Sequence, residues 1–405
     1  MPDTTVPEAG PTPAIVLGSG ASALGVVRSL RHIDAPVFMA CPARDLAARS
    51  RWYRPVPGTH PWDGTLGDAG LAALAALPLR RAAIIPTADD AALWLSAWRD
   101  HPLAARFVTS SSPRDTLELL QDKVRFAQLL AGTEVAHPRT YTIAQESDLR
   151  AIPFEALDRV FLKPADSQKF SDITGLKAVW ADGRTEFEEK WRRFAEQGIE
   201  VVAQEYVPGK PSDHYFVDGF RDRAGRITGM MARRRVRIFP LDFGNSSYCR
   251  SIPLADIPEA VAGVTSLLDR LAYRGIFSAE FKRDARDGAY RLLEINTRAW
   301  TYIEFATHCG VNVARMAYED ALERPVGPGQ ADYSVGKGCL DLYRDLNAVR
   351  ATRSTDRDSL PTILWQWASA HFHAFRFDDP RPGLYAARQI VSRALSSRIR
   401  GKKRR

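Results

Sequence analysis

The segment Gly275–Ala299 reads GIFSAEFKRDARDGAYRLLEINTRA, and it decides the fold that we expect for most of the chain. Two runs with alternating apolar residues flank the polar turn RDARDG, a pattern that predicts a β-hairpin. Because side chains alternate across a strand, the first strand is expected to bury Phe277, Ala279 and Phe281. Glu280 then lies on the opposite face of that strand.

In the second strand, Glu294, Asn296 and Arg298 are expected on the side opposite Leu293 and Ile295. The hairpin register brings these polar side chains to the carboxylate of the first strand. Two carboxylates and an amide oxygen are hard ligands that suit Mg²⁺ or Mn²⁺ and leave positions open for phosphate oxygens. The guanidinium of Arg298 is placed to stabilise a transferred phosphoryl or acyl-phosphate group. An ordinary solvated hairpin face is the alternative.

The chain has 405 residues, enough for two or three domains with cores of their own. Its apolar and charged fractions are typical of a globular protein, and no apolar run reaches the length of a membrane span. The N-terminus MPDTTVPEAG lacks the layout of a signal peptide. Four widely spaced cysteines without a CxxC pair indicate free thiols in a reducing cytoplasm, not a zinc site or disulfide framework.

The net charge of +8 is confined to one end of the chain. The last 25 residues, from Arg381, contain nine Lys or Arg and no acidic residue, so the remainder is nearly neutral. A basic tail on a neutral body argues against nucleic acid as a partner.

Residues 14–115 alternate short apolar strands with helices. Strands are expected at residues 14–17, 36–40, 82–86 and 106–109, and helices at residues 22–30 and 90–98. This alternation is typical of a parallel sheet covered by helices. The first turn, GSGASALG, carries Gly18, Gly20 and Gly25, but the spacing is GxGxxxxG and no acidic residue follows at the right distance. We therefore expect a structural or substrate-lining turn and no bound NAD.

Two lysines stand out in the next part of the chain. Lys123 lies near the start of an amphipathic helix, where a solvated side chain is the simpler interpretation. Lys163 ends the apolar strand RVFLKP, where a buried lysine needs an anion nearby. The polar segment ADSQKFSDITG follows, and either it covers a phosphate group or it is a plain hairpin loop. Its candidate phosphate-binding residues are Ser167, Lys169, Ser171 and Thr174.

The strand at residues 200–204 runs into EYVPG. Gln204, Glu205, Tyr206 and Val207 can offer backbone groups to the edge of an adenine ring, and Asp213 follows within reach of a ribose.

Taken in order, these parts resemble the ATP-grasp superfamily, and more narrowly its carboxylate–amine ligase branch with D-aspartate ligase. The resemblance covers residues 14 to about 325. It implies an α/β chain with an N-terminal Rossmann-like pre-ATP-grasp domain (14–115) after a disordered N-terminus (1–13). An ATP-grasp domain (116–325) in two subdomains, about 116–205 and 206–325, and a helical C-terminal region (326–405) would follow.

The resemblance also implies roles for individual residues. The family's two lysines that bind the nucleotide phosphates match Lys123 and Lys163. Its adenine-binding hinge matches Gln204 to Val207, and its ribose-binding acidic residue matches Asp213. The magnesium ligands match Glu280, Glu294 and Asn296. The phosphate-side arginine matches Arg298, and the basic strand in RRRVRIFPLDFG would direct Arg235 and Arg237 from one face towards the γ-phosphate or acyl substrate. The phosphate-covering loop departs from the family because Gly175 is its one glycine.

The activity implied is ATP-dependent joining of a carboxylate to an amine through an acyl phosphate, with ADP and phosphate released and an amino acid as one substrate. Alternatives are carboxylation or thioester formation by the same intermediate, or a non-catalytic, membrane-associated nucleotide-binding protein. A homodimer is left open.

The C-terminal region gives fewer signals. ILWQWASAHFHAFRF is expected to form a helix packed on the core, with metal binding by His371 and His373 the weaker alternative. A second helix is expected at residues 384–399, with an apolar stripe of Leu384, Ala387, Val391, Ala394 and Leu395. This basic amphipathic helix either rests on the anionic inner face of the membrane or packs on the body with a disordered end.

Overall fold

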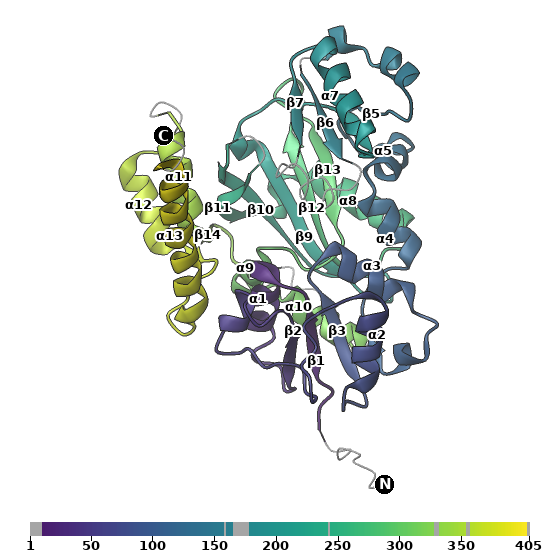
Figure 1. Ribbon diagram of the computed structural model, residues 1–405, viewed down its shortest axis with the longest axis vertical. Helices are drawn as coiled ribbons and strands as arrows, with labels where there is room; N and C mark the ends of the chain where they lie inside the picture. The colour runs from purple at the N-terminus through teal and green to yellow at the C-terminus, as the bar shows by residue number, and fades with distance from the viewer. Residues whose placement is uncertain are drawn as a thin grey trace.

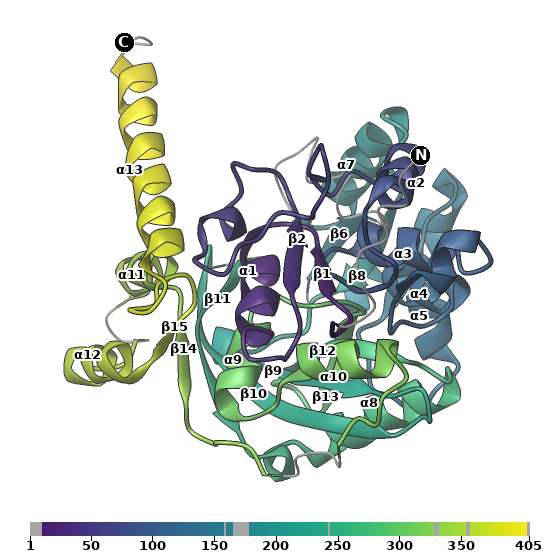
Figure 2. The ribbon, with the colours of Figure 1, turned by 90° about the horizontal axis from the view of Figure 1, so that it is seen from below.

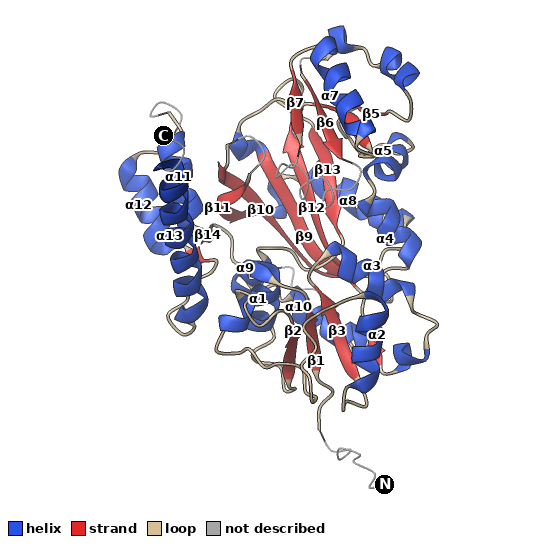
Figure 3. Cartoon of the chain, viewed as in Figure 1, coloured by secondary structure: helices blue, strands red, loops and turns tan. Residues whose placement is uncertain are grey.

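The computed structural model describes residues 10–157, 159–164, 178–241, 244–327, 332–353 and 357–402. The chain forms two four-stranded sheets and one seven-stranded sheet, with the large sheet in the middle of the molecule (Figure 1). Helices cover the sheets, as Figure 3 shows by colour. The predicted α/β fold is confirmed.

The N-terminal sheet is parallel, in the order β2-β1-β3-β4. Its strands are β1 (Ala14–Leu17), β2 (Val37–Ala40), β3 (Ala82–Pro86) and β4 (Phe107–Val108). Its helices are α1 (Gly20–Ser29), α2 (Gly67–Ala76) and α3 (Asp89–Ala97), with the short 3-10 turns η1 (Ala47–Arg49) and η2 (Pro102–Ala105). The strands of this sheet agree closely with those expected from the alternating pattern.

The glycine-rich turn after β1 has a packing explanation. A Cβ on Gly18 would lie 2.3 Å from Oγ1 of Thr87, and the residue has a φ of +124° that favours glycine. Gly25, on α1, faces Ile303 so closely that a Cβ would lie 2.8 Å from its side chain. Both glycines therefore permit close approach of neighbouring elements, as a structural turn requires.

The second four-stranded sheet is antiparallel, in the order β5-β8-β6-β7. Its strands are β5 (Thr140–Thr142), β6 (Val160–Pro164), β7 (Val179–Ala181) and β8 (Val201–Glu205), with α7 (Arg184–Glu196), η3 (Glu146–Ala151) and η4 (Phe154–Ala156). The helices α4 (Arg114–Gln121) and α5 (Lys123–Ala131) precede it. The single helix expected here is broken at Asp122, whose carboxylate accepts a hydrogen bond from the backbone N–H of Arg125 and caps α5.

The large sheet has the order β13-β12-β9-β10-β11-β14-β15. Its first five strands in the chain are β9 (His214–Arg221), β10 (Ile227–Phe239), β11 (Asn245–Ile252), β12 (Gly275–Arg283) and β13 (Tyr290–Asn296). They are accompanied by η5 (Pro211–Asp213), η6 (Leu254–Asp256), α8 (Pro258–Arg270), α9 (Ile303–Cys309) and α10 (Val313–Ala321).

The predicted hairpin is β12 and β13, which pair antiparallel. Phe277, Ala279 and Phe281 are buried in one cluster, as expected. The position of Leu293 was predicted wrongly. The register shifts from Glu280 opposite Glu294 to Phe281 opposite Leu292, so Leu293 is the extra residue of a β-bulge and Leu292 takes its place in the core.

Residues after 337 add both strands and helices. Strands β14 (Gly338–Leu340) and β15 (His371–Phe372) complete the large sheet, so the helix expected across His371 ends earlier. The helices are α11 (Leu342–Ala351), α12 (Leu360–Ser369) and α13 (Pro380–Lys402). They lie together on one side of the molecule, and α13 extends away from the body (Figure 2).

One apolar core joins the N-terminal sheet to the large sheet. It includes Val16 of β1 and Val26 of α1, together with Phe220 of β9 and Met231 of β10, all fully buried. Arg28, also fully buried, donates hydrogen bonds to Glu304 and Asp379 and so ties α1 to α9 and to the segment before α13. The loop that follows β13 is held against the end of β3, because the backbone N–H of Ala299 donates to the carbonyl of Pro86.

Candidate active site

The hairpin brings together the three proposed metal ligands. Glu280 on β12 lies directly opposite Glu294 on β13, and Asn296 lies opposite Ser278 two pairs further on. The amide of Asn296 donates a hydrogen bond of 3.3 Å to Oε1 of Glu294, which leaves its carbonyl oxygen for another contact. Two carboxylates and an amide oxygen on adjacent strands are a donor set that fits Mg²⁺.

Glu280 is held in its ionised form by two side chains from neighbouring strands. Nδ1 of His214 lies 2.7 Å and Nη2 of Arg235 lies 3.0 Å from the same oxygen, Oε1. Burial alone would raise the pKa of Glu280, but the charge of Arg235 and the bond from His214 outweigh it and hold this pKa well below its usual range. Burial, and then the charge of Arg235, lower the pKa of His214.

Lys123 reaches the same place from α5. Its Nζ lies 3.6 Å from Oε2 of Glu294, and its side chain is mostly buried. The break at Asp122 explains this position, because it makes Lys123 the first residue of a new helix that begins beside β13. The solvated side chain that sequence alone favoured is therefore not what the structure contains.

Lys163 lies near the end of β6, where it pairs with Val202 of β8 in the second sheet. The hinge follows β8: the N–H of Tyr206 donates to the carbonyl of Arg159, and Val207 is buried. Gln204 donates a hydrogen bond from Nε2 to Oγ1 of Thr140.

The carboxylate of Glu205 faces inward. It is buried and accepts hydrogen bonds from the guanidinium of Arg286 and from the backbone N–H of Arg139. Its side chain therefore braces the hinge, and its backbone N–H donates to the carbonyl of Arg139.

Asp213 ends η5, beside the start of β9. Its carboxylate accepts a 2.6 Å hydrogen bond from the backbone N–H of Lys210 and lies 3.7 Å from Nη2 of Arg234. Ser167, the proposed phosphate ligand of the loop, lies outside the described residues.

The structure separates the two arginines of β10 that were expected on one face. Arg235 contacts Glu280, whereas Nε and Nη2 of Arg237 bind the carboxylate of Asp345 on α11. The expectation of a shared face was therefore wrong. The cause is an irregular register with β11 on either side of Arg237, which breaks the simple alternation of side chains.

Arg298 also differs from the expectation. Strand β13 ends at Asn296, so Arg298 lies in the following loop and does not continue the face of the metal ligands. Its Nη2 donates a 3.1 Å hydrogen bond to Asp89 at the start of α3, while its buried Nε has no hydrogen-bond partner among the described residues. The guanidinium therefore lies between the hairpin and the carboxyl edge of the N-terminal sheet.

Three side chains at this site were missed in the sequence: His214, Lys282 and Arg286. Lys282 shares a face with Glu280, and its Nζ lies 4.3 Å from the centre of the Tyr206 ring, which in turn packs edge-on against Trp180. Burial lowers the pKa of Lys282 to about 8. A lysine two residues after Glu280, and so on the same face of the strand, was the signal that could have revealed it.

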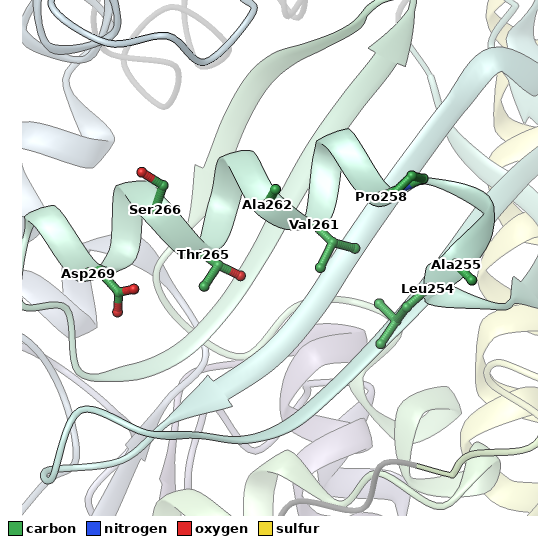
Figure 4. A pocket seen from close by; sticks show the side chains of 8 residues that line it. All are labelled: Leu254, Ala255, Pro258, Val261, Ala262, Thr265, Ser266 and Asp269. Carbon is green, nitrogen blue, oxygen red and sulfur yellow. The ribbon is translucent and has the colours of Figure 1, made fainter.

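A separate hollow of about 690 Å³ lies along the outer side of α8 (Figure 4). Its lining includes Val261, Thr265 and Asp269. Because α8 packs on the buried face of the hairpin, this hollow and the carboxylates lie on opposite sides of the sheet.

Comparisons with known proteins identify the class. The chain has the fold of biotin carboxylase from Campylobacter jejuni, with a TM-score of 0.62, 14% identity and coverage of 81% of this chain and 74% of that one. N5-carboxyaminoimidazole synthetase from Staphylococcus aureus in complex with ADP gives a TM-score of 0.61 at 12% identity, with 81% of each chain covered. L-amino acid ligase from Bacillus licheniformis gives 0.56 at 14% identity, covering 78% and 75%. The fold is the ATP-grasp fold.

Sequence similarity points to one branch of that class. The chain is 26% identical over 247 residues to D-aspartate ligase from Enterococcus faecium. The match spans 57% of this chain and 58% of that enzyme, so a little over half of each is compared. No protein-family model matches the chain. The resemblance to ATP-grasp carboxylate–amine ligases is confirmed by both comparisons together.

Proposed function

We propose that the protein is an ATP-dependent ligase that joins a carboxylate to an amine and releases ADP and phosphate. The observation that carries this proposal is the pairing of Glu280 with Glu294, with Lys123 beside them and Arg298 at the edge of the N-terminal sheet. The similarity to D-aspartate ligase and the fold of L-amino acid ligase support an amino acid as one substrate.

In this proposal each element has one task. Lys123, Lys163 and Ser167 bind the nucleotide phosphates, the backbone of Gln204 to Val207 binds the adenine, and Asp213 binds the ribose. Glu280, Glu294 and Asn296 would hold Mg²⁺ or Mn²⁺, which would supply positive charge to offset that of the phosphates. His214 and Arg235 keep Glu280 ionised and fixed in position.

The reaction then needs no nucleophile from the protein. A carboxylate oxygen of the substrate attacks the γ-phosphorus of ATP, and the bond to ADP breaks. The amine attacks the acyl carbon of the resulting acyl phosphate and phosphate leaves, while the amine loses a proton. Arg298 is positioned to stabilise the transferred group, and catalysis consists of orientation and charge stabilisation.

A second reaction of the same class is carboxylation. The names of two structural neighbours, biotin carboxylase and N5-carboxyaminoimidazole synthetase, favour it as the competing candidate. ADP release measured across a matrix of carboxylates and amines, including D- and L-amino acids, separates the two. Ligation predicts release that requires both a carboxylate and an amine, whereas release that requires bicarbonate contradicts it.

We also propose a cytoplasmic location. The support is that Cys41, Cys249, Cys309 and Cys339 are all buried free thiols, although Cys249 and Cys339 are directly opposite each other on paired strands. No helix in the described part of the chain is long and apolar enough to cross a membrane. Contact with a membrane surface is a separate proposal.

A further inference from the structure

Exposed apolar side chains gather in the C-terminal part of the chain. Ten large apolar side chains are exposed among the described residues, and eight of them follow residue 340. These eight are Leu342, Tyr343, Leu360, Leu364, Trp365, Phe377, Leu384 and Val391. Single exposed apolar residues are normal, but their concentration in α11, α12, α13 and one connecting loop distinguishes this part of the chain from the rest of the described residues.

The exposed side of α13 has a regular composition. Arg381, Leu384, Arg388 and Val391 are all exposed and follow one another at spacings of three or four residues. Residues with these spacings lie along one side of a helix. The sequence continues the same spacing with Leu395, Arg398 and Lys402, inside the bounds of α13. In its described part, from Arg381 to Val391, the stripe therefore alternates basic and apolar residues.

The first turns of α13 are fixed on the body, which sets the direction in which the stripe faces. The hydroxyl of Tyr385 donates a 2.7 Å hydrogen bond to the carbonyl of Arg44, and the guanidinium of Arg49 lies 4.8 Å from the centre of the Tyr385 ring. Tyr385 is half-buried in this contact, whereas Arg381, Leu384, Arg388 and Val391 stay exposed beside it, so the stripe faces outward. Beyond these turns α13 extends clear of the other elements (Figure 2).

Charge decides which partner fits. A second copy of α13 packed along the same stripe would place arginines against arginines. Like charges at such positions repel, so this packing is unfavourable. A nucleic acid would neutralise the arginines but would leave the leucine and valine without an apolar partner. An anionic bilayer surface satisfies both, since it accepts apolar side chains at the acyl boundary and attracts Lys and Arg to its headgroups.

We propose that α13 docks the protein on an anionic membrane surface through the stripe that begins with Arg381, Leu384, Arg388 and Val391. The nine basic residues from Arg381 onward, with no acidic residue among them, provide the long-range attraction. The apolar side chains of the stripe, Leu384 and Val391, would insert only to a shallow depth and would not cross the membrane. The docking proposal makes no assumption about the reaction, so it is tested independently of the proposed ligase activity.

The test is co-sedimentation of the full chain with vesicles of phosphatidylcholine, with and without about one third of phosphatidylglycerol. We expect binding to the anionic vesicles that weakens as salt is raised, and little binding to the neutral ones. The variant with Arg381→Gln and Arg388→Gln should bind about thirtyfold more weakly, from roughly fivefold for each basic residue near an anionic surface.

Two further variants separate the apolar contribution and control for charge. Leu384→Ser with Val391→Ser should also weaken binding while the net charge is unchanged. Arg150→Gln with Arg193→Gln removes the same charge from two exposed arginines outside the C-terminal helices and should bind as the native chain does. Far-UV circular dichroism checks that α13 keeps its helix in each variant, and a deletion of residues 390–405, which keeps Tyr385, replaces any variant that does not fold.

Four results would overturn the proposal. One is equal binding to neutral and anionic vesicles, or no binding to either. Another is a loss of binding in the control variant that matches the loss in the stripe variant, since the effect would then be net charge alone. The third is a shift in the sedimentation velocity of the chain by itself that disappears in the stripe variants, which would assign the surface to a second copy. Displacement from vesicles by an RNA oligonucleotide, with the serine variant unaffected, would assign it to nucleic acid.

Discussion

Strand β10 carries two buried arginines two residues apart, and each binds a carboxylate in a different way. Arg235 donates to Ser246 and to one oxygen of Glu280, whose side chain is 16% exposed. Arg237 donates three hydrogen bonds to Asp345, whose side chain is fully buried. The residue types are the same, but the surroundings of the two carboxylates differ.

Asp345 is saturated. Besides Arg237 it accepts hydrogen bonds from the hydroxyl of Ser247 and from the indole of Trp367, while Arg237 also binds Asp358 and Gln366. This network ties α11 and α12 to the large sheet. Buried charges of this kind are structural anchors, because every donor and acceptor is already used.

Glu280 is arranged differently, since the bonds from His214 and Arg235 both meet at Oε1 and a second carboxylate lies opposite. Two carboxylates held side by side repel unless a cation lies between them. The comparison teaches that a functional ion pair differs from a structural one in the carboxylate oxygens that it leaves for another ligand. By this criterion Arg237 belongs to the structural anchor and Arg235 belongs to the candidate active site.

The largest effect on stability is expected at the anchor. Asp345→Ala leaves Arg237 buried without its partner and should lower the free energy of unfolding by about 3–5 kcal/mol. Urea denaturation of the variant beside the native protein measures this. A loss below about 1 kcal/mol would mean that the anchor is weaker than its hydrogen bonds indicate.

The buried ion pair of Glu304 and Arg28 is a second anchor, and its contribution to the free energy of unfolding is expected to depend on pH. Burial opposes ionisation of Glu304, but the imidazole of His371, whose Nε2 lies 3.8 Å from Oε2, and the charge of Arg28 hold the pKa of Glu304 at about 2. Because this folded pKa is below the ordinary value, the stabilisation is present above about pH 5 and is lost as pH falls towards 2. It amounts to about 3 kcal/mol at neutral pH. The stability difference between the native chain and Glu304→Gln should therefore shrink between pH 7 and pH 3.5, and a constant difference would contradict it.

At the site the expected effect is on turnover. Glu294→Gln removes one charge from the proposed metal ligands and should reduce turnover by about a hundredfold, on the scale of a lost electrostatic stabiliser. The free energy of unfolding should change little, because Glu294 is partly exposed. Raising the Mg²⁺ concentration should recover part of the activity, and a variant that turns over normally would exclude Glu294 from the metal site.

The smallest effects come from a matched pair of substitutions on β10. Lysine keeps the charge of arginine but loses its planar fork. Arg235→Lys should lower turnover about tenfold with the stability nearly intact, while Arg237→Lys should lower the free energy of unfolding by about 1–3 kcal/mol with normal turnover per folded molecule. Equal effects of the two substitutions on turnover would remove the distinction between anchor and site.

The hairpin and its facing carboxylates could be predicted because alternation along a strand is a local property of the sequence. The bulge at Leu293 could not, since one extra residue changes the register without changing the composition. The same cause explains why Arg235 and Arg237 were placed together. Arg298 was misplaced because nothing in the spacing shows that β13 ends at Asn296.

Long-range pairing limited the rest. His214 reaches Glu280 because β9 pairs with β12, and the two residues are 66 positions apart. The saturation of Asp345 by residues of β10, β11 and α12 is likewise a property of the tertiary structure. Lys123 could be identified in the sequence as a candidate residue. Its role depends on the helix break at Asp122, which places it beside β13.

The central claim is that the carboxylate face of the hairpin directs attack at the γ-phosphorus. The most direct test is to identify the nucleotide product in the presence of Mg²⁺, the best carboxylate and hydroxylamine as the amine. The account predicts ADP, phosphate and an accumulating hydroxamate, all of them reduced about a hundredfold in Glu294→Gln. AMP and pyrophosphate would instead mean attack at the α-phosphorus through an acyl adenylate, and would contradict the assignment of this face.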